Sequence, residues 1–203
     1  MTIAAALLTI TVRVYDIYGL PAAERHEAIE TAGRIMAQAG IEAQFIECQP
    51  PLPEPCEVTL KPRELVLRIT PDAPPRHEVL GTAVVSPTGG PSVMATVFGN
   101  AVLEGAARNN VRLGTLAGRV AAHEIGHLLL GANSHSLHGL MRPKWDVTRA
   151  GADDWLFSSV DADTIRHKLA ALAATRSAAA IGDVFEAPGD GRAPDGPKTN
   201  PRG

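Results

Sequence analysis

The sequence predicts a mixed α/β fold (α+β), in which one twisted sheet of mixed strand direction packs against helices. Two patterns support this fold class: short segments alternate between apolar and polar residues, and longer segments repeat apolar residues at the helical spacing. The composition agrees, because 45% of the 203 residues are hydrophobic and 20% are charged, as in ordinary globular proteins. A chain of this length can bury a core of ordinary domain size.

The first third of the chain is expected to form strand, helix, strand, loop and strand. Residues 10–15 alternate between apolar and polar side chains, as a half-buried strand does. Residues 22–39 carry apolar side chains at helical spacing and end at Gly40, a typical helix stop. Two strands, at residues 41–47 and 64–70, then lie on either side of a proline-rich loop.

The middle of the chain predicts two more extended segments and one strong helix. Residues 81–85 and 92–99 flank a turn rich in Pro and Gly, and either segment could be an exposed edge strand. Residues 115–130 repeat apolar side chains at helical spacing, and Gly131 is placed to end that helix.

The C-terminal part predicts one more helix and a tail. Residues 162–180 place apolar side chains on one helical face, and Ser159 or Asp161 could cap its start. From residue 182 the chain is rich in Gly, Pro and Asp, a composition that cannot offset the entropy lost on ordering. We therefore expect one domain over residues 1–181 and a disordered tail over residues 182–203.

The charge and hydropathy patterns exclude two classes of partner. The net charge is -3, and the 19 basic residues are scattered among 22 acidic ones, so nucleic acid is not an expected partner. The apolar run at residues 3–12 is about half the length that spans a bilayer, and it continues into an alternating segment. We interpret it as a strand rather than a signal peptide, and we expect no membrane span.

The two cysteines bear on the cellular location. Cys48 and Cys56 flank the proline-rich loop, a separation that a disulfide could close in an oxidising compartment. The alternative is a pair of free thiols. A disulfide favours a secreted or periplasmic protein whose upstream signal is missing from this chain, whereas free thiols fit a cytoplasmic protein.

The run His123-Glu124-Ile125-Gly126-His127 carries the chemistry of the sequence. Histidines four apart on a helix lie one turn apart on the same face, so both imidazoles can bind one tetrahedral ion. Glu124 is turned about 100° from His123, which suits a base acting on a metal-held water better than a ligand. Burying two imidazoles and a carboxylate in an apolar helix costs free energy unless each has a partner. A zinc site is therefore predicted, with metal-free core histidines as the alternative.

A catalytic zinc ion needs a third protein ligand, and two histidines follow the helix. Gly131 lets the chain turn sharply, so the short polar stretch after it could bring His135 back towards the metal. His138 is the second candidate for this position.

These residues resemble the metzincin metallopeptidases, whose signature is His-Glu-x-x-His-x-x-Gly-x-x-His followed by a methionine turn. In this chain the glycine comes one residue late, at Gly131, and the third histidine two residues late, at His135. Asn133 stands where the strict spacing would place the third ligand. Met141 follows a glycine and an apolar residue, at a suitable distance for the methionine turn.

The resemblance implies a zincin-like catalytic domain over residues 1–181, with a mixed sheet, an active-site helix and a C-terminal helix. It implies a zinc metalloendopeptidase with one zinc ion per chain, which hydrolyses a peptide or protein substrate through a zinc-bound water. Glu124 would be the catalytic general base, Met141 the hydrophobic floor of the site, and residues 92–99 an edge strand that binds the substrate. The implied metal ligands are His123, His127 and His135.

Two other interpretations stay open. Residues 151–154 faintly resemble the Gly-x-x-Asp element of the aspzincins, which would make Asp154 the third ligand. The chain could also be a zinc-binding module without catalysis, although a structural site has no use for Glu124 and closes all four positions with protein ligands. Some metzincins carry a tyrosine after the methionine turn, whereas Tyr15 and Tyr18 lie far upstream here.

Overall fold

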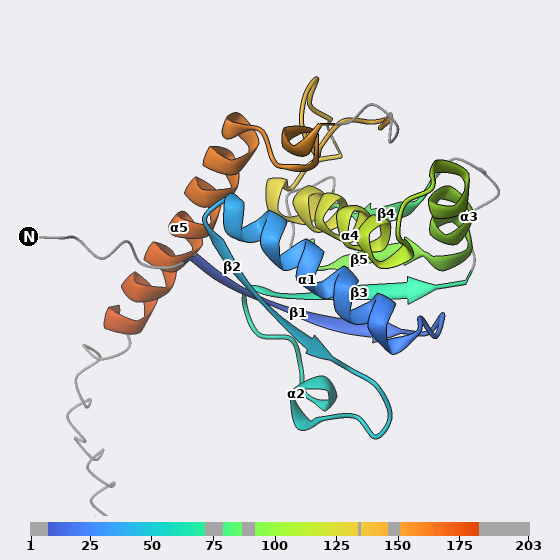
Figure 1. Ribbon diagram of the computed structural model, residues 1–203. Coiled ribbons are helices and arrows are strands. Elements are labelled where there is room, and N and C mark those ends of the chain that lie inside the picture. Colours follow the sequence, from blue (N-terminus) through green and yellow to red (C-terminus); the bar gives the residue numbers. More distant parts are fainter. Residues whose placement is uncertain (1–7, 72–78, 87–91, 134, 146–150, 183–203) are drawn as a thin grey trace, which may run out of the picture. The chain divides into compact units, whose positions relative to one another are not determined.

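The computed structural model describes residues 8–71, 79–86, 92–133, 135–145 and 151–182 (Figure 1). The chain divides into two compact units, Met1–Ala170 and Ala171–Gly203, and the sheet with its covering helices belongs to the first. Apart from residue 182, the tail expected at residues 182–203 lies outside the described residues. The domain boundary expected at residue 181 stays a prediction.

The sheet has five strands in the order β2-β1-β3-β5-β4 (Figure 1). These strands are β1 (Leu8–Asp16), β2 (Ile41–Glu47), β3 (Glu64–Thr70), β4 (Gly81–Val84) and β5 (Met94–Phe98). β1 pairs in parallel with β2 and β3, and β3 pairs in parallel with β5, whereas β4 is antiparallel to β5. The predicted mixed α/β fold class is confirmed, and each predicted strand is present.

The edge of the sheet differs from the expectation. β5 forms ladders with both β3 and β4, so its backbone groups are already paired and it is an interior strand. The assignment of residues 92–99 to a substrate-binding edge strand is therefore wrong. The edge strand at this end of the sheet is β4, at Gly81–Val84.

The described helices are α1 (Ala22–Gln38), α2 (Glu54–Glu57), α3 (Gly99–Asn109), α4 (Leu113–Leu130) and α5 (Ser159–Gly182), with a 3-10 turn at Ala152–Trp155. α1 and α4 match the helices predicted from the sequence, whereas α3 was not predicted. None of the described helices is long and apolar enough to cross a membrane.

α5 begins earlier than predicted, and Ser158 caps it rather than Ser159 or Asp161. The Asp161 N–H donates to Ser158 Oγ at 3.1 Å, and the Ala162 N–H donates to the Ser158 carbonyl at 2.9 Å. A serine hydroxyl that accepts an N–H group in the first helical turn is a common N-cap.

The start of α5 also reaches the C-terminal ends of α1 and α4. Arg166 Nη1 donates to the carbonyl of Ala39 at 2.8 Å, and Lys168 Nζ donates to the carbonyl of Leu130. The last carbonyls of a helix lack partners within the helix and carry partial negative charge. Two basic side chains of α5 therefore satisfy the ends of two other helices.

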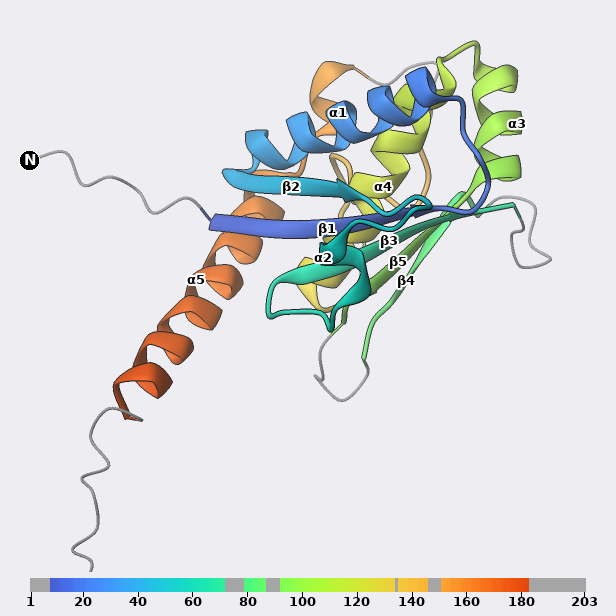
Figure 2. The same ribbon diagram turned by 90° about the horizontal axis from the view of Figure 1, so that it is seen from below.

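α1 and α4 lie side by side over one face of the sheet (Figures 1 and 2). Two glycines of α4 make this approach close. A Cβ added at Gly114 would lie 2.5 Å from the Glu24 carbonyl oxygen, and one at Gly118 would lie 2.5 Å from the Ala28 carbonyl oxygen. Backbone atoms of α1 cannot yield as a flexible side chain would, so α4 needs glycine at both positions.

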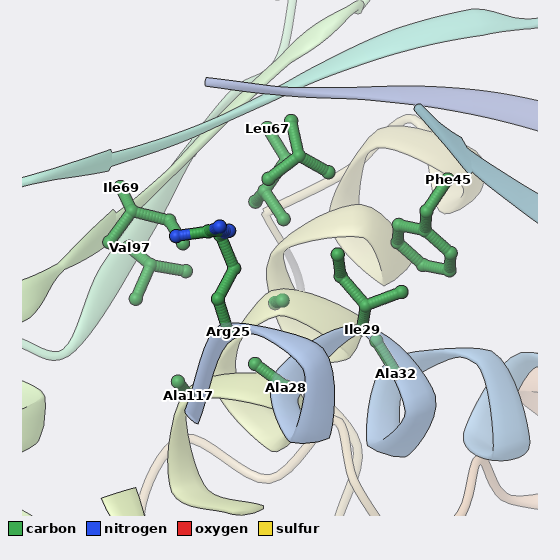
Figure 3. A pocket seen from close by; sticks show the side chains of 11 residues that line it. Arg25, Ala28, Ile29, Ala32, Phe45, Leu67, Ile69, Val97 and Ala117 are labelled. Atoms are coloured by element: carbon green, nitrogen blue, oxygen red, sulfur yellow. The ribbon is translucent and has the colours of Figure 1, made fainter. Parts of the chain in front are cut away.

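A small cavity remains where α1 meets the sheet (Figure 3). Its volume is about 10 Å³, which is close to the smallest space that holds one water molecule. Its walls are mainly apolar, and the residues labelled in Figure 3 are Arg25, Ala28, Ile29, Ala32, Phe45, Leu67, Ile69, Val97 and Ala117. We interpret it as an imperfection of core packing and not as a ligand site.

The loop that carries α2 is fixed by a disulfide and by a buried arginine. Cys48 and Cys56 form a disulfide, so this alternative of the sequence analysis is confirmed. Arg13 in β1 is buried, donates to the Val58 carbonyl at 2.6 Å and pairs with Glu64. The disulfide thus links the two ends of the loop, and Arg13 of β1 holds the segment that follows α2.

The Gly118→Ala variant should be less stable than the wild type by about 1–3 kcal/mol, because the added methyl group collides with the α1 backbone. The matched control is Gly105→Ala in α3, where a Cβ would meet only the ends of two flexible side chains, Leu116 Cδ2 at 3.3 Å and Leu80 Cδ2 at 3.6 Å. That control should be neutral or stabilising, because alanine favours helix over glycine. Urea unfolding measures both variants, and a Gly118→Ala protein as stable as the wild type would contradict the packing described.

Candidate metal centre

α4 presents His123 and His127 as a buried pair one helical turn apart. Their Nε2 atoms lie 3.1 Å apart, and both residues are among the buried polar groups of the core. Two nitrogens bound to one tetrahedral zinc ion are separated by about 3.3 Å, since each Zn–N bond is about 2.0–2.1 Å long. The spacing of the pair therefore suits one shared ion.

The outer nitrogen of each ring is held by a main-chain carbonyl. His123 Nδ1 lies 2.8 Å from the Leu140 oxygen, and His127 Nδ1 lies 3.0 Å from the Ala132 oxygen. A carbonyl only accepts hydrogen bonds, so each Nδ1 carries the hydrogen and each Nε2 presents a lone pair. Two lone pairs that face each other at 3.1 Å repel unless a cation lies between them.

His135 joins this pair from the loop after α4. The helix ends at Gly131 in the left-handed conformation, with φ of 62°, and the chain turns back. The His135 ring centroid lies 5.4 Å from that of His123 and 4.9 Å from that of His127. One ligand atom from each of the three histidines falls within 4.8 Å of the other two.

The competing candidates for the third position lie elsewhere. In the described part of the chain, the group that could hold a metal contains His123, His127 and His135 but neither His138 nor Asp154. Asp154 instead pairs with Arg142 at 3.1 Å and accepts the Gly151 N–H at 2.9 Å. The geometry therefore favours His135 over both alternatives.

Burial sets the protonation states at the centre. Burial of the His123 ring lowers its pKa to about 4, against an opposing effect of the hydrogen bond to Leu140. Burial also lowers the pKa of His127. Both imidazoles are therefore neutral at pH 7, as a metal ligand must be. Burial of Glu124 raises its pKa to about 8, so in the absence of a cation this carboxyl group holds its proton at neutral pH.

Gly81 in the edge strand leaves the space that Glu124 occupies. A Cβ at Gly81 would lie 2.8 Å from both Cγ and Oε1 of Glu124, and 2.9 Å from the Thr96 carbonyl oxygen. Sequence analysis missed this residue, although a glycine inside a strand often marks a close approach of another group.

Met141 lies beneath α4 as a fully buried side chain. A Cβ at Gly126 would lie 2.7 Å from Met141 Sδ and 2.7 Å from Phe157 Cε1, so the glycine inside the histidine motif allows this contact. Leu140, next to Met141, supplies the carbonyl that orients His123. The segment Leu140–Met141, which contains the methionine expected to form the floor of the site, thus contacts α4 at His123 and at Gly126.

One tryptophan lies at the centre, and the second packs against the first. Trp145 Nε1 donates to the Leu140 carbonyl at 2.9 Å, and its ring lies 5.2 Å from that of His123. Trp155 contacts Trp145 edge to face at 5.4 Å and lies under the guanidinium of Arg119 at 3.8 Å. Such aromatic and cation–π contacts support the loop around His123.

A cavity of about 660 Å³ opens at these residues. Its walls include the edge strand β4, the metal-facing side of α4 and the segment that follows Met141. The three histidines and Glu124 line it together, so they are accessible to a ligand of a few residues in length.

The stability of the metal-free protein should depend on pH through these groups. Through His123, the free energy of unfolding decreases as the pH falls from 6.5 to about 4, because the imidazole binds a proton in the unfolded state before it does so in the folded state. Through Glu124, the free energy of unfolding decreases as the pH rises from 4.5 to about 8, because the carboxyl group releases its proton in the unfolded state before it does so in the folded state. The two effects oppose each other between pH 4.5 and 6.5.

Glu124→Gln removes the pH dependence that comes from Glu124 and leaves the one that comes from His123. In urea unfolding with a chelator present, the stability of the variant relative to the wild type should rise by roughly 5 kcal/mol between pH 4.5 and 8. A constant difference between the two proteins over this range would mean that Glu124 is not buried as described.

No protein-family model matches the sequence, and no curated protein is similar to it. A solved structure is similar in fold: archaemetzincin (amzA) from Methanopyrus kandleri, with a TM-score of 0.53 and 14% sequence identity. The similarity covers 82% of this chain and 98% of the archaemetzincin chain. The mixed five-stranded sheet with its covering helices is therefore a zincin-like fold of the archaemetzincin type.

Proposed function

We propose that this protein is a metzincin-like zinc metallopeptidase whose ion is held by His123, His127 and His135. The observation that carries the proposal is the convergence of three histidine donor atoms within 4.8 Å of one another, beside a buried glutamate. Three protein ligands with a fourth position open to a cavity are typical of catalytic zinc, whereas structural zinc has four protein ligands. The archaemetzincin-like fold is consistent with this proposal.

A zinc ion bound there would supply Lewis-acid polarisation of a carbonyl group and would acidify a water molecule. Glu124 would accept a proton from the attacking water and then pass it to the leaving amine. The low-polarity surroundings of Glu124 favour its protonated form, which assists the first transfer. Gly81 keeps the carboxyl group against β4, where it lines the same cavity as the histidines.

An extended peptide is the substrate that the cavity fits best. β4 is an edge strand, so one side of its backbone is unpaired in the described sheet, and Gly81, Thr82 and Ala83 line the cavity. A peptide that pairs with this edge would pass the three histidines as an added strand. Binding along a strand, rather than at a closed pocket for one terminus, supports cleavage within a chain, as an endopeptidase does.

The Cys48–Cys56 disulfide supports a secreted or periplasmic location for this activity. Disulfides persist in oxidising compartments and are rare in the cytosol.

The zinc content of purified variants tests the ligand set. Wild-type protein should bind one zinc ion per chain, and His123→Ala and His127→Ala should lose it. His135→Ala should bind zinc at least about 100-fold more weakly, because removing a donor atom costs more than the roughly 10-fold to 100-fold lost with a residue that only supports a ligand. His138→Ala is the matched control and should bind as the wild type does, since His138 lies outside the cluster. Elemental analysis after dialysis against a chelator measures all five proteins. Retention of zinc by His135→Ala and its loss by His138→Ala would reverse the assignment of the third ligand.

Glu124→Gln tests the catalytic step. The variant should lose peptide hydrolysis by about 10²-fold to 10⁴-fold, because the amide cannot carry the proton, while it keeps zinc. Glu104→Gln, an exposed change on α3, is the control and should keep full activity. The readout is kcat/KM on a fluorogenic peptide library, and hydrolysis by Glu124→Gln at more than a tenth of the wild-type rate would rule out Glu124 as the base.

A further inference from the structure

We propose that Asp161, in the first turn of α5, positions the third candidate ligand His135 through Ser136. The inference rests on the proposed zinc site and adds a residue to it that does not touch the metal. It follows from the way the loop after α4 is fixed to the start of α5.

His135 is attached differently from the other two histidines. His123 and His127 lie on a helix, and a main-chain carbonyl orients each ring. His135 lies on a loop, is exposed, and makes no ring-nitrogen hydrogen bond to the described residues. Its position therefore depends on what holds the loop.

Ser136, the residue after His135, is held by hydrogen bonds of both its side chain and its main chain. Ser136 Oγ lies 2.8 Å from both carboxylate oxygens of Asp161 and donates its hydrogen to them. The Ser136 N–H donates to the Met141 carbonyl at 2.9 Å. Both the main chain and the side chain of Ser136 are thus anchored, one peptide bond away from His135.

Asp161 is itself rigidly placed. It is buried, with 8% exposure, and Ser158 Oγ donates to its Oδ2 at 2.7 Å. Its N–H group donates back to Ser158 Oγ at 3.1 Å, and its charge lies at the favourable end of the helix dipole. The contacts with Ser158 are sufficient to cap the helix, so capping alone leaves the two contacts with Ser136 unexplained.

The rest of the loop is fixed to the segment that precedes α5. The Leu140 N–H donates to the Leu156 carbonyl at 2.7 Å, and a Cβ at Gly139 would lie 2.6 Å from that oxygen. Leu140 in turn orients His123. The segment before α5 therefore supports one ligand through Leu140, and Asp161 supports another through Ser136.

The test is the zinc dissociation constant of the full chain, measured by competition with a chromogenic chelator. Asp161→Ala should weaken zinc binding about 10-fold, the lower end of what a residue supporting a metal ligand contributes. Ser136→Ala should weaken it equally, and the double variant should bind no more weakly than either single variant, because both changes break one connection. Ser158→Ala removes the helix cap and one contact of the Asp161 carboxylate but keeps the Ser136 contact, so it should lower the unfolding midpoint and weaken zinc binding less than Ser136→Ala does.

Ser136→Ala leaves α5 and its cap intact, so it tests the connection even where Asp161→Ala fails to fold. Unchanged zinc affinity in Ser136→Ala, together with weakened binding in His135→Ala, would overturn the role of Asp161 and leave the proposed ligand set standing. Losses that add in the double variant would also overturn it, since the two residues would then act independently. Unchanged binding in His135→Ala would instead refute the ligand set itself.

Discussion

The structure depends on one constraint: an apolar helix at its centre carries three buried ionisable side chains that must all find partners. Fourteen of the 18 residues of α4 are buried, including His123, Glu124 and His127. Buried polar groups without partners cost several kcal/mol each, so the surroundings of α4 are built around them. The carbonyls of Ala132 and Leu140 satisfy the outer ring nitrogens, and their positions in turn fix the course of the chain after the helix. The inner nitrogens and the carboxyl group face the cavity, which is where chemistry can occur.

Glycines give this helix its close neighbours on three sides. Gly114 and Gly118 admit the α1 backbone, Gly126 admits Met141, and Gly81 of the edge strand admits Glu124. A helix interior usually disfavours glycine, at a cost of about 1 kcal/mol relative to alanine. That cost is offset here because contacts with backbone and with Met141 replace the missing side chains. The close packing at Gly114, Gly118 and Gly126 leaves the side of α4 that bears the histidines and Glu124 facing the cavity beside β4.

The sequence predicted features that depend on local pattern, and it missed those that depend on distant contacts. The strands, α1, α4 and the two helical histidines follow from periodicity and spacing, and Gly131 in the left-handed conformation brings His135 back as expected. The edge strand was misassigned because strand order depends on how the chain crosses over, which no local pattern encodes. α3 follows β5 directly and has no side-chain cap, so no signal marked its start. Asp161 looked like an ordinary helix cap because its link to Ser136 joins segments far apart in sequence.

The contacts that α5 makes with the ends of α1 and α4 have a consequence for biosynthesis. A chain emerging from the ribosome exposes the histidine motif well before Asp161, Arg166 and Lys168 have been synthesised. Until then the carbonyls at the ends of both helices, and the loop with the third histidine, lack the groups that hold them. A nascent chain would therefore fix the positions of its three clustered histidines only after the first turns of α5 have been synthesised and have reached the loop and the ends of α1 and α4.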